Sequence, residues 1–256
     1  MGAKLGEQFV YTHYLIRDRK LYCKYNNNNG PSVVFEAGLG DTRETWNYIQ
    51  EEISTGVSSL SYDRAGVGKS DRVEIPRSCM DMVYDLSELL SKVPLEPPFI
   101  IVAHSFGGLV ARLFASMYPE LVAGIILIDS AVEYKELFYE KVLLKPQIEA
   151  NREYYSNPML NSEKIDKVQS YNQISSNKNL KNIPLTIIMR GLPDNFDADL
   201  PNDKLLEVDQ KLQHNLKKLS TKSKVIIAEY SSHYIQQQQP ELVIREIKNL
   251  IGYQSN

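Results

Sequence analysis

Residues 100–108 read Ile-Ile-Val-Ala-His-Ser-Phe-Gly-Gly, an apolar run that ends at a serine flanked by small residues. This pattern is typical of a nucleophile elbow, in which a buried strand turns sharply into a helix and projects a serine hydroxyl above the sheet. The residues two before and two after the serine must be small because the two backbones nearly touch there, and they are Ala103 and Gly107. A serine in such a sequence can also serve only as a helix cap, so the choice between nucleophile and cap depends on other parts of the chain.

Length, charge and cysteine content exclude several classes of protein. The 256 residues suit one α/β domain, 1–256, with a small insertion. A net charge of -3 without a long basic run gives no basis for binding nucleic acid or an anionic membrane, so a small-molecule substrate and a monomer or homodimer are expected. Cys23 and Cys79 are too few for a disulfide framework, and residues 1–10 lack the apolar core of a signal peptide. No apolar run is long enough to cross a bilayer, and a cytoplasmic location is expected.

Strands and helices alternate along most of the chain, which predicts a mostly parallel eight-stranded sheet with helices on both faces. Two paired strands form an antiparallel edge, and six more follow: 9–16, 20–25, 32–36, 57–62, 99–103, 123–128, 185–189 and 224–229. Helices are expected over 42–53, 80–92, 106–118, 203–219 and 240–251. Gly252 is expected to supply the C-terminal cap of the last helix.

One interval, about 132–182, breaks this alternation and is predicted to form a small helical lid. It has no convincing strand, and Pro146 and Pro158 interrupt its helix-like pieces. A long aromatic-rich excursion between two buried strands can roof a pocket over the strand ends, although its aromatic side chains can equally pack the insertion against the body. The expected pocket residues are Gly38, Tyr134, Phe138 and Tyr234.

A working Ser105 needs a histidine base within reach. His13 lies on the first strand, His104 points away from Ser105 in an elbow, and His214 lies within a helix. His233 follows the last strand and precedes the last helix, so a loop can hold it above the sheet edge. His233 is therefore the expected base.

The base in turn needs a carboxylate that holds its tautomer and stabilises the imidazolium ion. Asp129 ends the strand 123–128, and Asp194 follows the strand 185–189. Both are expected at the carboxyl edge of the sheet, where open α/β folds bind their ligands. Either one can instead be a turn or cap residue.

Acyl transfer also needs backbone donors for the oxyanion, and one good donor contributes about 3 to 4 kcal/mol. The elbow supplies the N–H of Phe106. The loop Ala37-Gly38-Leu39-Gly40-Asp41 can bring the N–H of Leu39 beside it, although its glycines can equally serve the turn alone. The expected oxyanion hole is therefore made by Leu39 and Phe106.

A second glycine-rich segment, Gly66-Val67-Gly68-Lys69-Ser70, ends like a phosphate-binding loop. That motif requires another glycine where this chain has Asp63, and no helix is expected to start at Ser70. The chain also lacks an H-E-x-x-H motif and clustered cysteine and histidine ligands. Nucleotide, metal and other cofactors are therefore not expected.

Over nearly its whole length the chain resembles the α/β-hydrolase superfamily, in its serine-nucleophile esterase/lipase-like branch. Four landmarks occur in the family's order: the loop 36–41, the turn 63–70, the elbow 103–108 and His233. The resemblance implies a structural role for the turn, and a serine at 105 in place of aspartate argues against dehalogenase and epoxide-hydrolase chemistry. The chain departs from the common pattern at Ala37, where many members have histidine, and at Ala103, where glycine is usual.

The family places its acid after the strand on either side of the lid. Asp129 suits the first placement and Asp194 the second, and we expect Asp129 with Asp194 as the alternative. The resulting prediction is a cofactor-free serine hydrolase that cleaves a small or medium acyl ester, thioester, amide or lactone through an acyl-enzyme. A ligand receptor or signalling protein with slow turnover and a cofactor-independent oxygenase are the alternatives.

Overall fold

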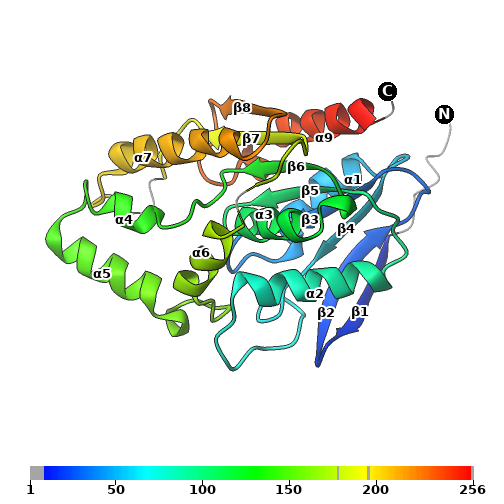
Figure 1. Cartoon of the computed structure of the whole chain (residues 1–256), viewed down its shortest axis with the longest axis horizontal. Helices are drawn as coiled ribbons and strands as arrows, with labels where there is room; N and C mark the ends of the chain where they lie inside the picture. The colour runs from blue at the N-terminus through cyan, green and yellow to red at the C-terminus, as the bar shows by residue number, and fades with distance from the viewer. Residues whose placement is uncertain (1–8, 178, 195–196, 255–256) are drawn as a thin grey trace.

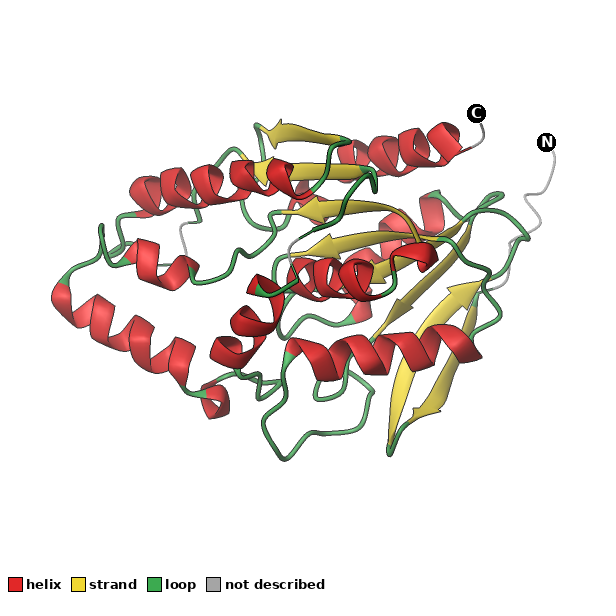
Figure 2. Ribbon diagram, in the orientation of Figure 1, coloured by secondary structure: helices red, strands yellow, loops and turns green. Residues whose placement is uncertain are grey.

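Eight strands form one sheet between two layers of helices (Figures 1 and 2). The computed structural model describes residues 9–177, 179–194 and 197–254, so most of residues 1–10, predicted to lack the core of a signal peptide, lies outside the described residues. The strand order is β1-β2-β4-β3-β5-β6-β7-β8, in which β1, β2 and β4 pair antiparallel and the strands from β4 through β8 pair parallel. The predicted fold class is confirmed.

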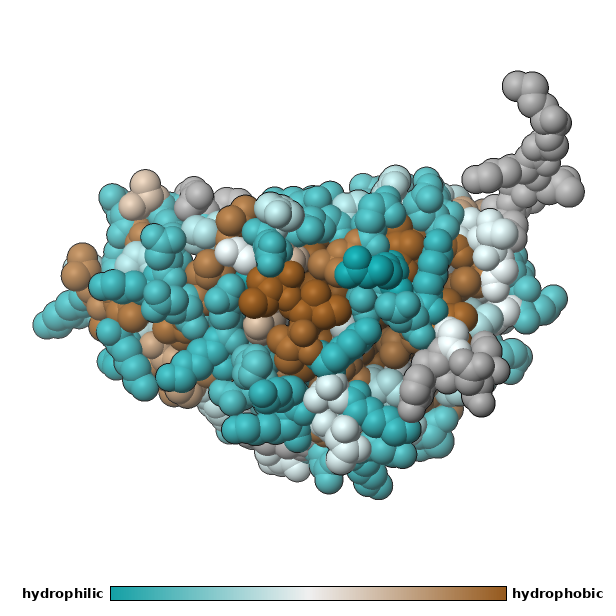
Figure 3. All heavy atoms as spheres, turned by 90° about the horizontal axis from the view of Figure 1, so that it is seen from above, coloured by the Kyte–Doolittle hydropathy of each residue, from teal (hydrophilic) through white to brown (hydrophobic). Residues whose placement is uncertain are grey.

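Each strand begins and ends within one residue of its predicted boundary. The bounds are β1 Val10–Ile16, β2 Arg19–Asn26, β3 Ser32–Glu36, β4 Ser58–Tyr62, β5 Phe99–His104, β6 Val122–Ile128, β7 Leu185–Arg190 and β8 Ser223–Ala228. All residues of β3, β4, β5 and β7 are buried, as expected for parallel strands covered by helices on both faces. The edge strand β8 is different, since Ile227 is 50 % exposed. Figure 3 looks onto the top of the molecule in Figure 1, where β8 lies, and shows apolar surface among polar side chains there.

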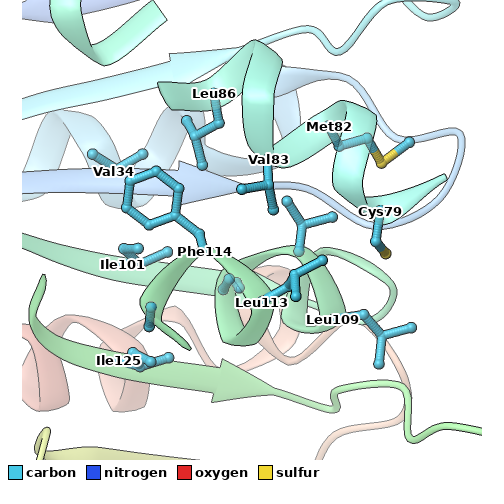
Figure 4. Close-up of a cluster of buried hydrophobic side chains, with 14 of the residues drawn as sticks. Val34, Cys79, Met82, Val83, Leu86, Ile101, Leu109, Leu113, Phe114 and Ile125 are labelled. Atoms are coloured by element: carbon cyan, nitrogen blue, oxygen red, sulfur yellow. The ribbon is translucent and has the colours of Figure 1, made fainter. Parts of the chain in front are cut away.

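Two separate clusters of apolar side chains form the core, one on each face of the sheet. On one face α2 (Cys79–Lys92) and α3 (Gly107–Met117) pack together, with Phe114 near Leu86 and Val34 (Figure 4). On the other face lie α1 (Asn47–Glu52), α8 (Ile235–Gln238) and α9 (Pro240–Gln254). The helix α7 (Asn202–Asn215) packs against β7.

Three predicted helix boundaries are wrong. The helix expected over 42–53 divides at Trp46 into the 3-10 turn η1 (Arg43–Trp46) and α1, because the Trp46 ring is buried against Phe35 with ring centres 5.1 Å apart. The helix expected over 203–219 stops at Asn215 and continues as the 3-10 turn η4 (Leu216–Leu219). Gly252 does not cap α9; it lies within the helix, which continues to Gln254.

Helices alone fill the insertion between β6 and β7, apart from an isolated bridge between Arg77 and Ile165, within the described residues of 132–182. They are α4 (Lys135–Tyr139), α5 (Lys145–Ser156) and α6 (Lys167–Ser175), with the 3-10 turn η3 (Pro158–Leu160) before α6; the remaining 3-10 turn, η2 (Pro119–Leu121), precedes β6. Figure 1 shows α4 and α5 beyond the carboxyl ends of the parallel strands. In the part of the chain that the structure describes, no helix combines the length and apolar character needed to span a bilayer.

Candidate active site

Ser105 lies at the sharp bend between β5 and α3, and its backbone has the left-handed value φ = 51°. Such a conformation is strained for a residue with a side chain, so the surrounding contacts must hold it in place. The Ser105 N–H donates to the carbonyl oxygen of Ile128 at 3.0 Å, and its own carbonyl accepts from Ala131 at 2.9 Å. A Cβ on Gly107 would lie 2.4 Å from the carbonyl oxygen of Ala37, so only glycine fits there.

His233 and Asp129 meet beyond the carboxyl ends of β8 and β6, the two strands that flank β7. Nδ1 of His233 lies 2.6 Å from Oδ2 of Asp129, whose side chain is 2 % exposed. Asp194 does not touch the ring; its Oδ1 accepts the backbone N–H of His233 at 3.1 Å. The structure therefore brings both candidate aspartates to His233, one to the imidazole and the other to the main chain.

Arg190, at the end of β7, joins these two carboxylates and a third. Its Nη1 donates to Asp129 at 3.0 Å and to Asp194 at 2.7 Å, and its Nη2 donates to Asp209 at 2.7 Å. Gln213 donates to the other oxygen of Asp129 at 2.8 Å. Burial raises the pKa of Asp129, but the hydrogen bond from His233 and the charge of Arg190 outweigh it and hold that pKa well below its usual value.

Sequence reasoning missed Arg190, Asp209 and Gln213. Arg190 ends a fully buried strand, where a charged residue needs a buried partner. Asp209 and Gln213 are the buried residues of α7 and lie one helical turn apart. Two polar residues on the buried face of a helix were the available signal, although nothing in the chain indicates which strand end they reach.

A second group of side chains holds His233 from the other side. The His104 ring is buried, and its Nε2 lies 2.9 Å from the carbonyl oxygen of His233. Because a carbonyl oxygen can only accept a hydrogen bond, Nε2 carries the proton. Nδ1 of His104 is 3.4 Å from Asp41, which also accepts a hydrogen bond from the Tyr234 hydroxyl at 3.2 Å. Burial lowers the pKa of His104, against the opposing effect of Asp41. The ring, N–H and carbonyl of His233 are thus each held by a different residue.

The loop that carries Leu39 adjoins the elbow, since a Cβ on Gly107 would lie 2.4 Å from the carbonyl oxygen of Ala37, and Phe106 belongs to the elbow itself. Within the described residues, neither Leu39 nor Phe106 donates its N–H to a protein acceptor. In the same part of the chain, no hydrogen bond joins the Ser105 hydroxyl to the His233 ring. Catalytic hydrogen bonds are often long or poorly aligned without substrate, so the absence of this bond is compatible with Ser105 as nucleophile and His233 as base.

The four predicted pocket residues separate into two pairs. A Cβ on Gly38 would lie 2.9 Å from Nδ1 of His104, and the Tyr234 ring packs 5.4 Å from that of His233. Tyr134 instead hydrogen-bonds Asn172 at 2.5 Å within the insertion, and Phe138 is exposed. A cavity of about 230 Å³ adjoins His233, and its lining includes Lys135, Tyr139, Arg190, Asp194 and Leu205.

The glycine-rich turn that resembles a phosphate-binding loop is occupied by its own aspartate. Asp63 accepts the backbone N–H of Arg43 at 2.8 Å and of Lys69 at 2.9 Å. A Cβ on Gly68 would lie 2.1 Å from Oδ2 of Asp63. The carboxylate thus takes the place that a phosphate would need. Among the described residues, no group of three histidine, cysteine, aspartate or glutamate side chains could hold a metal ion.

Comparison with known proteins agrees with this architecture. Residues 31–180 match the family model for the alpha/beta hydrolase fold, more than half of the chain, and the chain therefore belongs to that family. It is 28 % identical over 218 residues to the uncharacterized protein YqjL of Bacillus subtilis (strain 168), covering 84 % of this chain and 81 % of that protein.

Solved structures share the fold at lower sequence identity. A putative lipase from Acinetobacter baumannii AYE superposes with a TM-score of 0.73 and 17 % identity, covering 97 % of this chain and 93 % of that one. A thermophilic esterase from Thermogutta terrifontis superposes with a TM-score of 0.63 and 19 % identity, covering 96 % and 98 %.

Proposed function

We propose that this protein is a serine hydrolase in which Ser105, His233 and Asp129 form the catalytic triad. The observation that carries the proposal is the 2.6 Å contact between His233 and the buried Asp129, on the loops beside the strained Ser105. A serine hydroxyl, an imidazole and a buried carboxylate in this order are the parts that acyl transfer requires. No cofactor enters the proposed reaction.

The geometry suggests a role for each residue. Asp129 accepts a hydrogen bond from the Nδ1–H of His233, which leaves Nε2 of that ring unprotonated and able to take the proton of the Ser105 hydroxyl. The serine oxygen attacks the acyl carbonyl carbon, and the N–H groups of Leu39 and Phe106 stabilise the oxyanion. His233 then protonates the departing alcohol as its bond to the acyl carbon breaks. A water molecule, deprotonated by His233, then attacks the acyl carbon; the bond from that carbon to the Ser105 oxygen breaks, His233 returns the proton to this oxygen, and the acid leaves.

The proposed substrate is a small or medium acyl ester, or a thioester, amide or lactone. The strained Ser105 and the contact between His233 and Asp129 support attack on an acyl carbonyl, the group that all of these substrates share. The insertion also lies beside His233, where Lys135 and Tyr139 line a cavity of about 230 Å³, so we expect it to influence the choice of substrate.

Covalent labelling with a fluorophosphonate tests the nucleophile, and hydrolysis of p-nitrophenyl esters of increasing chain length tests the reaction. We expect the label on Ser105, and we expect Ser105→Ala to lower kcat about a million-fold because the triad acts as a unit. Ser116→Ala, on the helix that follows the elbow, is the matched control and should retain wild-type kcat. Near-normal turnover by folded Ser105→Ala would contradict the proposal. Labelling without turnover of any ester would instead favour a receptor.

A further inference from the structure

Three charged side chains meet in the interior beneath the loop 37–41, which carries the Leu39 N–H. They are Glu36 at the end of β3, Arg64 after β4, and Glu163 from the insertion between η3 and α6. Their exposed fractions are 0 %, 3 % and 0 %. Removing three charges from water is costly unless each charge has well-placed partners.

Every N–H group of the Arg64 guanidinium has an acceptor. Nε and Nη2 bind the two oxygens of Glu163 at 2.8 and 2.6 Å, and Nη1 binds Glu36 at 2.6 Å. The two remaining N–H groups reach the main chain of the loop, at the carbonyl oxygens of Ala37 (2.6 Å) and Gly38 (2.5 Å). These five hydrogen bonds fix the orientation of the guanidinium. Because two of them go to the carbonyl oxygens of Ala37 and Gly38, they also fix the direction of those carbonyls.

The Gly38 carbonyl and the Leu39 N–H belong to one planar trans peptide, so they point in opposite directions. Arg64 holds the carbonyl end of this peptide, which directs the N–H of Leu39 away from the guanidinium. The next peptide is held as well, because the N–H of Gly40 donates to Glu163 at 2.7 Å. Arg64 and Glu163 therefore hold the peptides on both sides of Leu39.

We propose that Arg64 and Glu163 are positioning residues that aim the Leu39 N–H at the oxyanion, and that the insertion thereby completes the oxyanion hole. This inference rests on the proposed serine hydrolase. Glu163 belongs to the insertion, whereas the loop it holds follows β3 in the body of the domain. Any displacement of the insertion that moves Glu163 also releases the Gly40 N–H and the guanidinium fork.

Glu163→Gln tests the proposal, because an amide cannot accept both N–H groups of the guanidinium fork. We expect kcat for p-nitrophenyl esters to fall about 10- to 100-fold, less than or similar to the loss of a whole oxyanion donor. KM should change by less than about threefold, since the donor acts on the transition state. The affinity of a trifluoromethyl ketone, which forms an oxyanion on the serine, should fall in parallel with kcat.

Glu133→Gln is the matched control. Glu133 forms a bidentate ion pair with the buried Arg112 at 2.8 and 3.0 Å. This pair also joins the insertion to the body, but neither hydrogen bond involves the loop 37–41, here called the oxyanion loop. This variant should lose stability and keep its kcat within about twofold, because no donor of the oxyanion hole moves. An equal loss of kcat in Glu133→Gln would overturn the proposal.

Unchanged kcat in folded Glu163→Gln would also overturn it. Should Glu163→Gln fail to fold, Glu163→Asp makes the same comparison, because it keeps the charge but moves the carboxylate away from the N–H of Gly40. An unchanged kcat in Glu163→Asp would likewise overturn the proposal. Wild-type protein that neither hydrolyses the esters nor takes the fluorophosphonate at Ser105 would instead defeat the proposed function itself. The two failures are therefore distinguishable.

Discussion

At the scale of single residues, Asp129 and Asp194 differ in which atom of His233 each one contacts. Asp129 binds the imidazole at 2.6 Å, whereas Asp194 binds the backbone N–H at 3.1 Å. We expect Asp129→Asn to lower kcat about 10⁴-fold, because an amide at this position favours the wrong imidazole tautomer. Asp194→Asn should cost about tenfold or less, since its amide oxygen can still accept the N–H of His233. Steady-state ester hydrolysis by the two variants measures the difference, and the reverse order of effects would make Asp194 the acid.

The sequence could not choose firmly between these two aspartates because the deciding contacts are not local. Both residues follow parallel strands and end at the same edge of the sheet. The distinction depends on Gln213 and Arg190, which orient the Asp129 carboxylate from a helix and a strand that lie much later in the chain. The strand pattern predicts where a carboxylate lies, whereas the packing of α7 determines which way it points.

At the scale of an element, the elbow depends on close contact between α3 and the end of β3. A Cβ on Gly107 would lie 2.4 Å from the carbonyl oxygen of Ala37 and 2.7 Å from that of Glu36, both of them backbone atoms. We expect Gly107→Ala to lower the free energy of unfolding by about 1 to 3 kcal/mol and to reduce ester turnover, because the oxyanion loop must shift. Urea unfolding followed by circular dichroism measures the stability of the variant.

Gly252→Ala is the control for this substitution, since nothing lies within 4 Å of its Cβ position in α9. Alanine there should stabilise the protein by about 0.5 to 1 kcal/mol through its helix propensity. Equal free energies of unfolding for the two variants would show that the elbow does not need its glycine. The pair also explains why the sequence predicted the elbow but not the end of α9. The elbow follows a local steric rule, whereas a glycine near the end of a helix is compatible both with a cap and with continuation of the helix.

At the scale of the whole molecule, the sheet and the positions of Ser105 and His233 could be predicted because strand periodicity and loop placement are properties of short segments. The buried ionic contacts could not be predicted in this way. Glu163 binds the N–H of Gly40 across 123 positions of the chain, and no short pattern around either residue indicates the other. The insertion was predicted from its composition as a roof over a pocket, yet one of its residues reaches the interior beneath the oxyanion loop.

Buried His104 connects the elbow to the His233 loop and makes the stability of the whole fold depend on pH. Burial lowers the pKa of His104 below its usual 6.5, so the unfolded chain binds this proton more readily. The stabilisation is therefore complete above pH 6.5 and is lost as the pH falls below that value, by at most about 1.4 kcal/mol at pH 5.5. Urea unfolding at pH 7.5 and 5.5 measures this loss, and His104→Gln, which retains a donor for the His233 carbonyl but cannot titrate, should show a smaller one. An identical pH dependence in the two proteins would assign the effect to other groups.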